Sequence, residues 1–141
     1  MFAIDRESYQ ALVDHARAEF PNEACALLAG DGRVERVYPV PNSEASPTMY
    51  VIDPRDYLRV EEEWDRHGWD LVAVFHSHVA TEAYPSRTDV GLALPGVAYL
   101  ILSLADPAEP VLRAFRIEDG RIREEPVELV DRAGESSRVA G

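Results

Sequence analysis

Two histidines that stand two positions apart, His76 and His78, are the residues of this chain best suited to chemistry. On a β-strand, positions i and i+2 point to the same face, so both imidazoles should lie on one side of the strand, about 6 to 7 Å apart. They directly follow Asp70–Phe75 (DLVAVF), an apolar run typical of a buried central strand. Ligand sites in α/β sheets lie beyond the carboxyl ends of such strands, so this pair is a candidate metal site.

A third ligand should come from the nearby chain, because two imidazoles and a carboxylate suit zinc and leave a fourth position for water. Glu82 and Asp89 could each supply the carboxylate. Glu82 falls in a predicted loop, whereas Asp89 falls in the first turn of a predicted short helix over Ser86–Leu94. Since rigid backbone holds a ligand more firmly than a loop does, we favour Asp89.

A zinc hydrolase also needs a base that takes a proton from the water. The chain has no H-E-x-x-H segment, so no helical glutamate between two histidines supplies it. Glu23 is the candidate, because it begins the apolar run Glu23–Ala29 (EACALLA), where a carboxylate is costly to bury without a partner. Taken alone, Glu23 is better explained as a surface residue that precedes a strand.

The remaining segments predict the elements that would position these residues. Helical spacing predicts a helix over Ile4–Phe20 with Asp5 as its N-cap, and Asp53-Pro54 opens a second helix that ends at Gly68. Apolar or alternating runs predict strands over Glu23–Ala29, Arg33–Val40, Met49–Ile52, Asp70–Phe75, Val97–Leu104, Pro110–Ile117 and Arg121–Val127.

This mixture of strands and helices predicts an α/β layered domain, with a mixed β-sheet flanked by helices. An Asp31-Gly32 turn should join the first two strands as a hairpin. We expect residues 1–130 to form one domain. Residues 131–141 are small and polar, so we expect a disordered tail there.

Composition bounds the partners and the compartment. A formal net charge of −12 argues against nucleic acid as a partner, because phosphate binding needs a basic surface. One cysteine, Cys25, cannot form an internal disulfide, which favours a reducing compartment. No apolar run approaches the roughly 18 residues of a membrane helix, and the N-terminus lacks signal-peptide features. We therefore expect a cytoplasmic protein with no membrane partner, and homo-oligomer formation stays open.

The spacing of the polar residues resembles a known family, the JAMM (MPN+) metalloproteases. His76-Ser-His78, seven further residues and then Ser86-x-x-Asp89 match that family's H-x-H-x(7)-S-x-x-D signature, and Glu23 matches its upstream glutamate. Residues 21–30 (PNEACALLAG) also resemble the segment around the family's catalytic glutamate. The resemblance covers nearly the whole chain, from about Ile4 to Val127.

The resemblance implies a fold and a role for each matched residue. It implies the MPN fold, a cytidine-deaminase-like layered domain, and one zinc ion per chain on His76, His78 and Asp89 with water as the fourth ligand. Glu23 is then the general acid and base, and Ser86 stabilises the oxyanion. These roles agree with zinc chemistry, since zinc lowers the pKa of a bound water to about 7 and polarises a carbonyl.

The family also implies a substrate class. The short connections of this chain resemble the compact bacterial branch, which acts on ubiquitin-like or sulfur-carrier proteins that end in Gly-Gly. The implied activity is hydrolysis of an amide bond at the terminal glycine, as a peptidase or isopeptidase, with release of cysteine in cysteine biosynthesis as one form. The chain departs from many relatives at Val79, where they have proline, and at Ala26, where they have glycine; both changes could alter the substrate groove.

Other functions compete with this hypothesis. A non-catalytic MPN scaffold shares the fold, but such scaffolds typically lack the metal ligands that this chain keeps. A zinc nucleobase deaminase needs an H-x-E and a P-C-x-x-C pattern, and a chain with one cysteine cannot provide them. Ser86 and Asp89 could also be a helix cap and a first-turn acid, and capping is compatible with catalysis.

Overall fold

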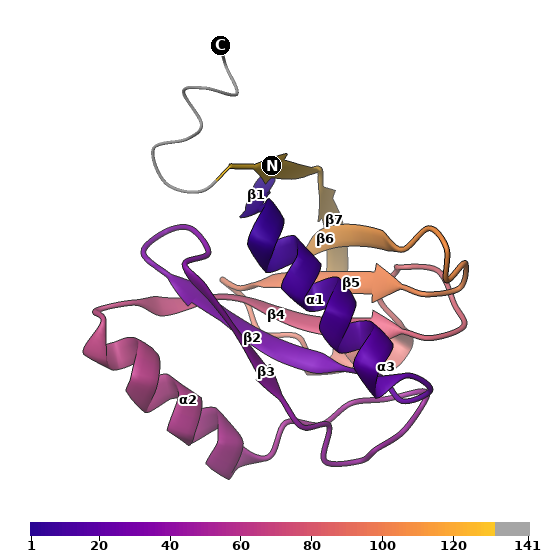
Figure 1. Cartoon of the computed structure of the whole chain (residues 1–141), viewed down its shortest axis with the longest axis horizontal. Coiled ribbons are helices and arrows are strands. Elements are labelled where there is room, and N and C mark those ends of the chain that lie inside the picture. The colour runs from indigo at the N-terminus through magenta and orange to yellow at the C-terminus, as the bar shows by residue number, and fades with distance from the viewer. Residues whose placement is uncertain (132–141) are drawn as a thin grey trace.

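A mixed sheet runs through the centre of the molecule with the strand order β3-β2-β4-β5-β6-β7 (Figure 1). In that order the strands are Arg36–Val40, Cys25–Gly30, Asp70–His78, Ala98–Ser103, Val111–Glu118 and Arg121–Glu125. Strands β4 and β5 run parallel, and the other neighbouring pairs of this sheet are antiparallel. The computed structural model describes residues 1–131, and within them it confirms the predicted α/β architecture with a mixed sheet.

Helices cover both faces of this sheet. They are α1 (Arg6–Glu19), α2 (Pro54–Arg66) and α3 (Arg87–Leu92). Each begins after a residue whose side chain accepts a backbone N–H of the first turn, namely Asp5, Asp53 and Ser86. The predicted caps at Asp5 and Asp53 are therefore confirmed.

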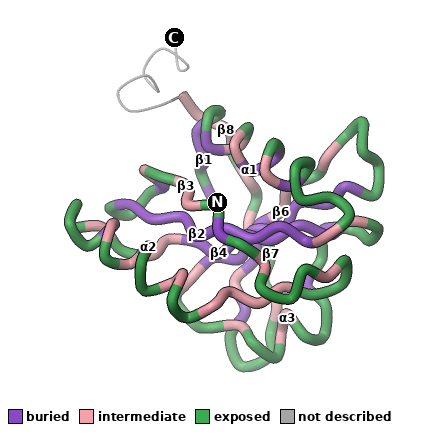
Figure 2. The backbone as a smooth tube through the Cα atoms, turned by 60° about the horizontal axis from the view of Figure 1, so that its bottom comes forward, coloured by how far each residue is buried: buried purple, intermediate pink, exposed green. Residues whose placement is uncertain are grey.

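Side chains alternate along β4, so successive residues point to opposite faces of the sheet. Ala73 and Phe75 pack in the cluster that contains α1, whereas Val74 packs with α2. His76 and His78 continue the series of Val74, so their rings lie on the face that carries α2 and α3. The central strands are buried along much of their length, while the helices expose their outer surfaces (Figure 2).

The first and the last of the described strands form a second, smaller sheet that the sequence did not predict. β1 (Phe2–Asp5) pairs in parallel with β8 (Val127–Val130). Ile4 therefore lies in a strand and not in the first helix, which begins at Arg6. The predicted strand Arg121–Val127 is interrupted at Pro126, because proline has no N–H to donate to a ladder.

The predicted strand over Met49–Ile52 is wrong. This segment is irregular and pairs with no described strand. The side chain of Asn42 satisfies its backbone instead: Nδ2 donates to the carbonyl of Met49 at 2.9 Å, and Oδ1 accepts from the N–H of Val51 at 3.1 Å. A side chain that supplies both kinds of hydrogen bond removes the need for a neighbouring strand.

Two further expectations concern the chain as a whole. The predicted tail over 131–141 lies, from residue 132 onward, outside the described residues. None of the helices that the structure describes has the length and apolar character needed to cross a membrane.

Candidate metal centre

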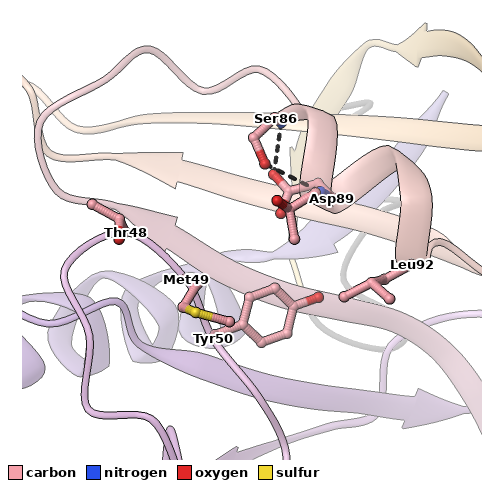
Figure 3. A pocket seen from close by; sticks show the side chains of 7 residues that line it. Thr48, Met49, Tyr50, Ser86, Asp89 and Leu92 are labelled. Atoms are coloured by element: carbon pink, nitrogen blue, oxygen red, sulfur yellow. Dashed lines mark hydrogen bonds between the residues drawn. The ribbon is translucent and has the colours of Figure 1, made fainter.

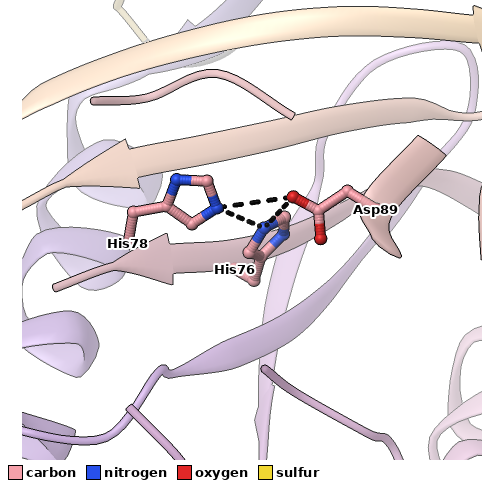
Figure 4. A group of neighbouring side chains, drawn as sticks. All are labelled: His76, His78 and Asp89. Carbon is pink, nitrogen blue, oxygen red and sulfur yellow. Dashed lines mark hydrogen bonds and ion pairs between the residues drawn. The ribbon is translucent and has the colours of Figure 1, made fainter. Parts of the chain in front are cut away.

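Three predicted ligands converge at the carboxyl end of β4 (Figure 4). Nε2 of His76 lies 3.2 Å from Nε2 of His78 and 3.2 Å from Oδ2 of Asp89. Nε2 of His78 lies 3.4 Å from the same Asp89 oxygen. Both histidines are almost completely buried, so the three groups meet below the protein surface.

These separations fit a tetrahedral ion. Ligand atoms about 2.0 to 2.1 Å from zinc, at tetrahedral angles, lie about 3.3 Å from one another. The three observed separations of 3.2, 3.2 and 3.4 Å match this value. Two imidazoles and one carboxylate are also a donor set typical of zinc with an open fourth position.

The orientation of His78 is set by the loop that follows β4. Its Nδ1–H donates to the backbone carbonyl of Glu82 at 2.8 Å. In the neutral ring this fixes the proton on Nδ1 and leaves the lone pair of Nε2 directed at the other two ligands. Glu82 thus contributes its carbonyl, while its carboxylate side chain is 80% exposed and lies 3.9 Å from Arg113. The structure places the carboxylate of Asp89, and not that of Glu82, beside the two histidines.

Asp89 is held by the helix start that the sequence predicted. Oδ2 of Asp89 accepts from the N–H of Ser86 at 2.8 Å, and Oγ of Ser86 accepts from the N–H of Asp89 at 3.1 Å. This capping box fixes the carboxylate on the first turn of α3. Burial raises the pKa of Asp89, but hydrogen bonds from His76 and His78 outweigh burial and hold that pKa well below its usual range.

Burial acts on both imidazoles with different results. It lowers the pKa of His76 more than the neighbouring Asp89 raises it, so this ring stays neutral and can act as a ligand. Burial also lowers the pKa of His78, but hydrogen bonds to Asp89 and to the Glu82 carbonyl, with the charge of Glu23, raise it overall. Nδ1 of His76 is buried and has no hydrogen-bond partner among the described residues.

Glu23 lies two residues before β2, near the cluster. β2 pairs with β4 so that Cys25 is opposite His76, and continuing this antiparallel register by two residues sets Glu23 opposite His78. The residue is only 5% exposed. Burial raises the pKa of Glu23 to about 7, and the nearby His78 lowers it in part. A carboxyl group whose pKa suits a general base thus lies near enough to His78 and Asp89 for their charges to act on it.

Ser86 lies at the rim of the site and is exposed. Its Oγ accepts the N–H of Asp89 and, within the described part of the chain, donates no hydrogen bond. A hydroxyl can accept and donate at the same time, so the Ser86 proton is available to a substrate oxygen. Capping and catalysis are therefore compatible at this residue.

Sequence reasoning missed Tyr50, which lies in the loop before α2. Its ring stacks on the imidazole of His76, with the ring centroids 4.5 Å apart and the planes at 20°. Tyr50 also lines a small pocket with Met49, Ser86, Asp89 and Leu92 (Figure 3). No local pattern of a loop residue could have indicated this contact.

Cys25 and Ala26, close to Glu23 in sequence, take no part in the cluster. Cys25 is completely buried, and burial raises the pKa of its thiol to about 12, so the thiolate nucleophile is absent near neutral pH. Ala26 packs in the cluster with α1, on the sheet face opposite His76. The side chain that distinguishes it from glycine therefore lies on the sheet face opposite His76 and His78.

Comparison with known proteins shows the family of this chain. Residues 5–118 match the family described as prokaryotic homologs of the JAB domain. The "CysO-cysteine peptidase" of Mycobacterium tuberculosis (strain ATCC 25618 / H37Rv) is 44% identical over 135 residues, covering 93% of this chain and 92% of that protein. The "Probable TtuB-protein conjugate cleaving protease" of Thermus thermophilus is 37% identical over 108 residues, covering 76% of this chain and 70% of that protein.

A solved structure shows the same fold along most of the chain. The solution structure of protein DSY2949 from Desulfitobacterium hafniense superposes with a TM-score of 0.88 at 38% identity, covering 96% of this chain and 97% of that one. The family match, the identity to curated relatives and the fold lead to one conclusion. This chain belongs to the prokaryotic branch of the JAB (JAMM/MPN) domain family.

Proposed function

We propose that this protein is a zinc-dependent peptidase that hydrolyses an amide bond at the C-terminal glycine of a ubiquitin-like or sulfur-carrier protein. The observation that carries the proposal is the convergence of His76, His78 and Asp89 with separations suited to one zinc ion. The buried Glu23 beside them supplies the acid and base. We further propose that residues 1–130 act as one catalytic domain with one zinc ion.

Each residue of the site has a distinct part in the reaction. His76, His78 and Asp89 would hold zinc, which when bound activates water and polarises the scissile carbonyl. Glu23 accepts a proton from the attacking water and later gives it to the leaving amine. The Ser86 hydroxyl donates a hydrogen bond to the carbonyl oxygen as negative charge develops there.

The proposed role of Ser86 predicts a large catalytic effect and a small structural one. Ser86→Ala should lower kcat by about 10²–10³-fold, because one oxyanion donor is lost. Loss of the N-cap should cost about 0.5–2 kcal/mol of folding stability. Ser86→Thr, which keeps a hydroxyl and a cap, is the matched control and should stay within about tenfold of the parent. If Ser86→Ala kept parental kcat with zinc bound, the oxyanion role would be wrong.

The names of the relatives support the substrate class. One relative is named as a peptidase of a CysO-cysteine substrate and another as a protease of TtuB-protein conjugates. The first name describes cleavage between CysO and cysteine and the second cleavage of a TtuB-protein conjugate, and both are compatible with hydrolysis of a carrier conjugate. Release of cysteine from the carrier, as a step of cysteine biosynthesis, belongs to this proposal. A non-catalytic scaffold is less well supported, since such a role needs neither the three ligands nor a buried base.

The direct test uses a Gly-Gly-tailed carrier protein that bears one cysteine in amide linkage at its C-terminus. We expect the zinc-loaded full chain to release that cysteine and leave a carrier that ends in glycine, as measured by intact mass. The same carrier joined to a lysine side chain tests isopeptidase activity in parallel. An unchanged mass for both conjugates after long incubation would contradict the proposal and favour the scaffold.

A further inference from the structure

The two histidines of the metal centre are held in different ways. His78 is fixed through Nδ1, which donates to the Glu82 carbonyl at 2.8 Å. Histidines that bind metals usually have such a partner, and it sets both the tautomer and the ring orientation. Nδ1 of His76 has no such partner among the described residues, although the residue is only 1% exposed. No hydrogen bond at Nδ1 within the described part of the chain therefore helps to hold the plane of His76.

Tyr50 is the group in position to do this. Its ring lies nearly parallel to the imidazole of His76, at 20° and with 4.5 Å between the centroids. Contact over a ring face restricts rotation about the side-chain torsions, because turning the imidazole would bring its edge into the neighbouring ring. The direction of Nε2 toward His78 and Asp89 then follows from packing.

We propose that Tyr50 is a positioning residue of the metal centre, whose ring fixes the plane of His76 in place of a hydrogen bond to Nδ1. The inference rests on the proposed metal site and adds to it a residue outside the family signature. The ring, and not the hydroxyl, carries this role. Within the described residues no hydrogen bond to the Tyr50 hydroxyl is formed, and burial raises the pKa of this hydroxyl above its ordinary value, which favours the neutral phenol.

The loop around Tyr50 is itself held by one side chain. The amide of Asn42 bonds the residues on either side of Tyr50, through the carbonyl of Met49 at 2.9 Å and the N–H of Val51 at 3.1 Å. Its Nδ2 also donates to the backbone carbonyl of Glu23 at 3.0 Å. Asn42 therefore ties the loop that carries Tyr50 to the strand end that carries Glu23.

The test is zinc affinity, measured by competition with a chelator on the full chain, independently of any substrate. Tyr50→Leu should weaken zinc binding by about 10- to 100-fold, as loss of an outer partner of a metal ligand does. Tyr50→Phe keeps the ring and should bind zinc within about twofold of the parent. Tyr57→Leu is the matched control, since Tyr57 packs on Trp64 in the same cluster and should leave zinc affinity unchanged.

The outcomes separate this inference from the metal site it rests on. Parental affinity in Tyr50→Leu would overturn it, and so would an affinity of Tyr50→Phe as low as that of Tyr50→Leu. If Tyr50→Leu did not fold, the zinc affinity of Asn42→Asp would test the inference instead. This change removes the hydrogen bonds that Nδ2 donates to the carbonyls of Glu23 and Met49. Zinc binding weakened by up to about tenfold in Asn42→Asp would support the role, and unchanged binding would overturn it. A parent that binds no zinc would instead refute the proposed metal site.

Discussion

Glu23→Gln should bind zinc as the parent does and lose turnover by about 10²–10⁴-fold. Glutamine has nearly the same shape but cannot accept the proton of the attacking water. The three proposed ligands do not include Glu23, so zinc content should not change. The measurement is kcat on the carrier conjugate, with zinc content measured in the same preparations.

The same variant should change the pH dependence of folding in the metal-free protein. Burial raises the pKa of Glu23 from 4.5 to about 7 in the folded chain. Because the folded pKa is the higher one, the stability that Glu23 contributes is fully present below about 4.5 and is lost as pH rises through about 7. Metal-free Glu23→Gln should therefore gain on the parent by on the order of 1–3 kcal/mol between pH 4.5 and pH 8, by urea unfolding in chelator.

Glu82→Gln is the matched control for this carboxylate. The Glu82 side chain lies close to the site in sequence but is 80% exposed, and His78 is bonded to its backbone carbonyl. We expect parental turnover and zinc content in Glu82→Gln. Full activity in Glu23→Gln would refute the acid and base role, and loss of zinc in that variant would make Glu23 a ligand.

His78→Ala should abolish hydrolysis, because it removes one of the three proposed ligands. The two that remain, the imidazole of His76 and the carboxylate of Asp89, should not retain zinc. The parent should also unfold at a higher urea concentration when zinc is added, gaining about 2.7 kcal/mol at a free zinc concentration 100 times its Kd. His78→Ala should show no such gain at that concentration. His67→Ala, at an exposed position after α2, should keep both the activity and the gain.

The parts of the fold that could be predicted are those that local chemistry determines. The pairing of β2 with β3 was predicted from two runs that flank Asp31-Gly32, although residues 31–35, and not a two-residue turn, connect the strands. Helix α2 follows from Asp53 as cap and Pro54 at its first position. The β1–β8 pair could not be predicted in this way. Phe2 pairs with Val127, and no local pattern in a four-residue strand indicates a partner so distant in the chain.

In the site, too, some features could be predicted from the sequence and others could not. The spacing of His76 and His78 on a strand, with Asp89 on the next helix, predicted the three groups that the structure brings together. Their supports could not be predicted, because His78 is bonded to a backbone carbonyl and His76 is stacked on Tyr50. Backbone acceptors have no sequence signature.

Tyr50 also lies in a segment whose structure was predicted wrongly. The apolar run Met49–Ile52 is typical of a strand by composition, but Asn42 supplies hydrogen bonds to it as a side chain. Such bonds between distant positions depend on the folded loop and not on the local pattern of apolar residues.

Zinc content is the measurement that tests the central claim most directly. Purified parent, His78→Ala and His67→Ala would be loaded with zinc, dialysed and compared by elemental analysis. The account predicts about one zinc ion per chain in the parent and in His67→Ala, and almost none in His78→Ala. No zinc in the loaded parent, or equal zinc in His78→Ala, would contradict a metal centre built on His76, His78 and Asp89.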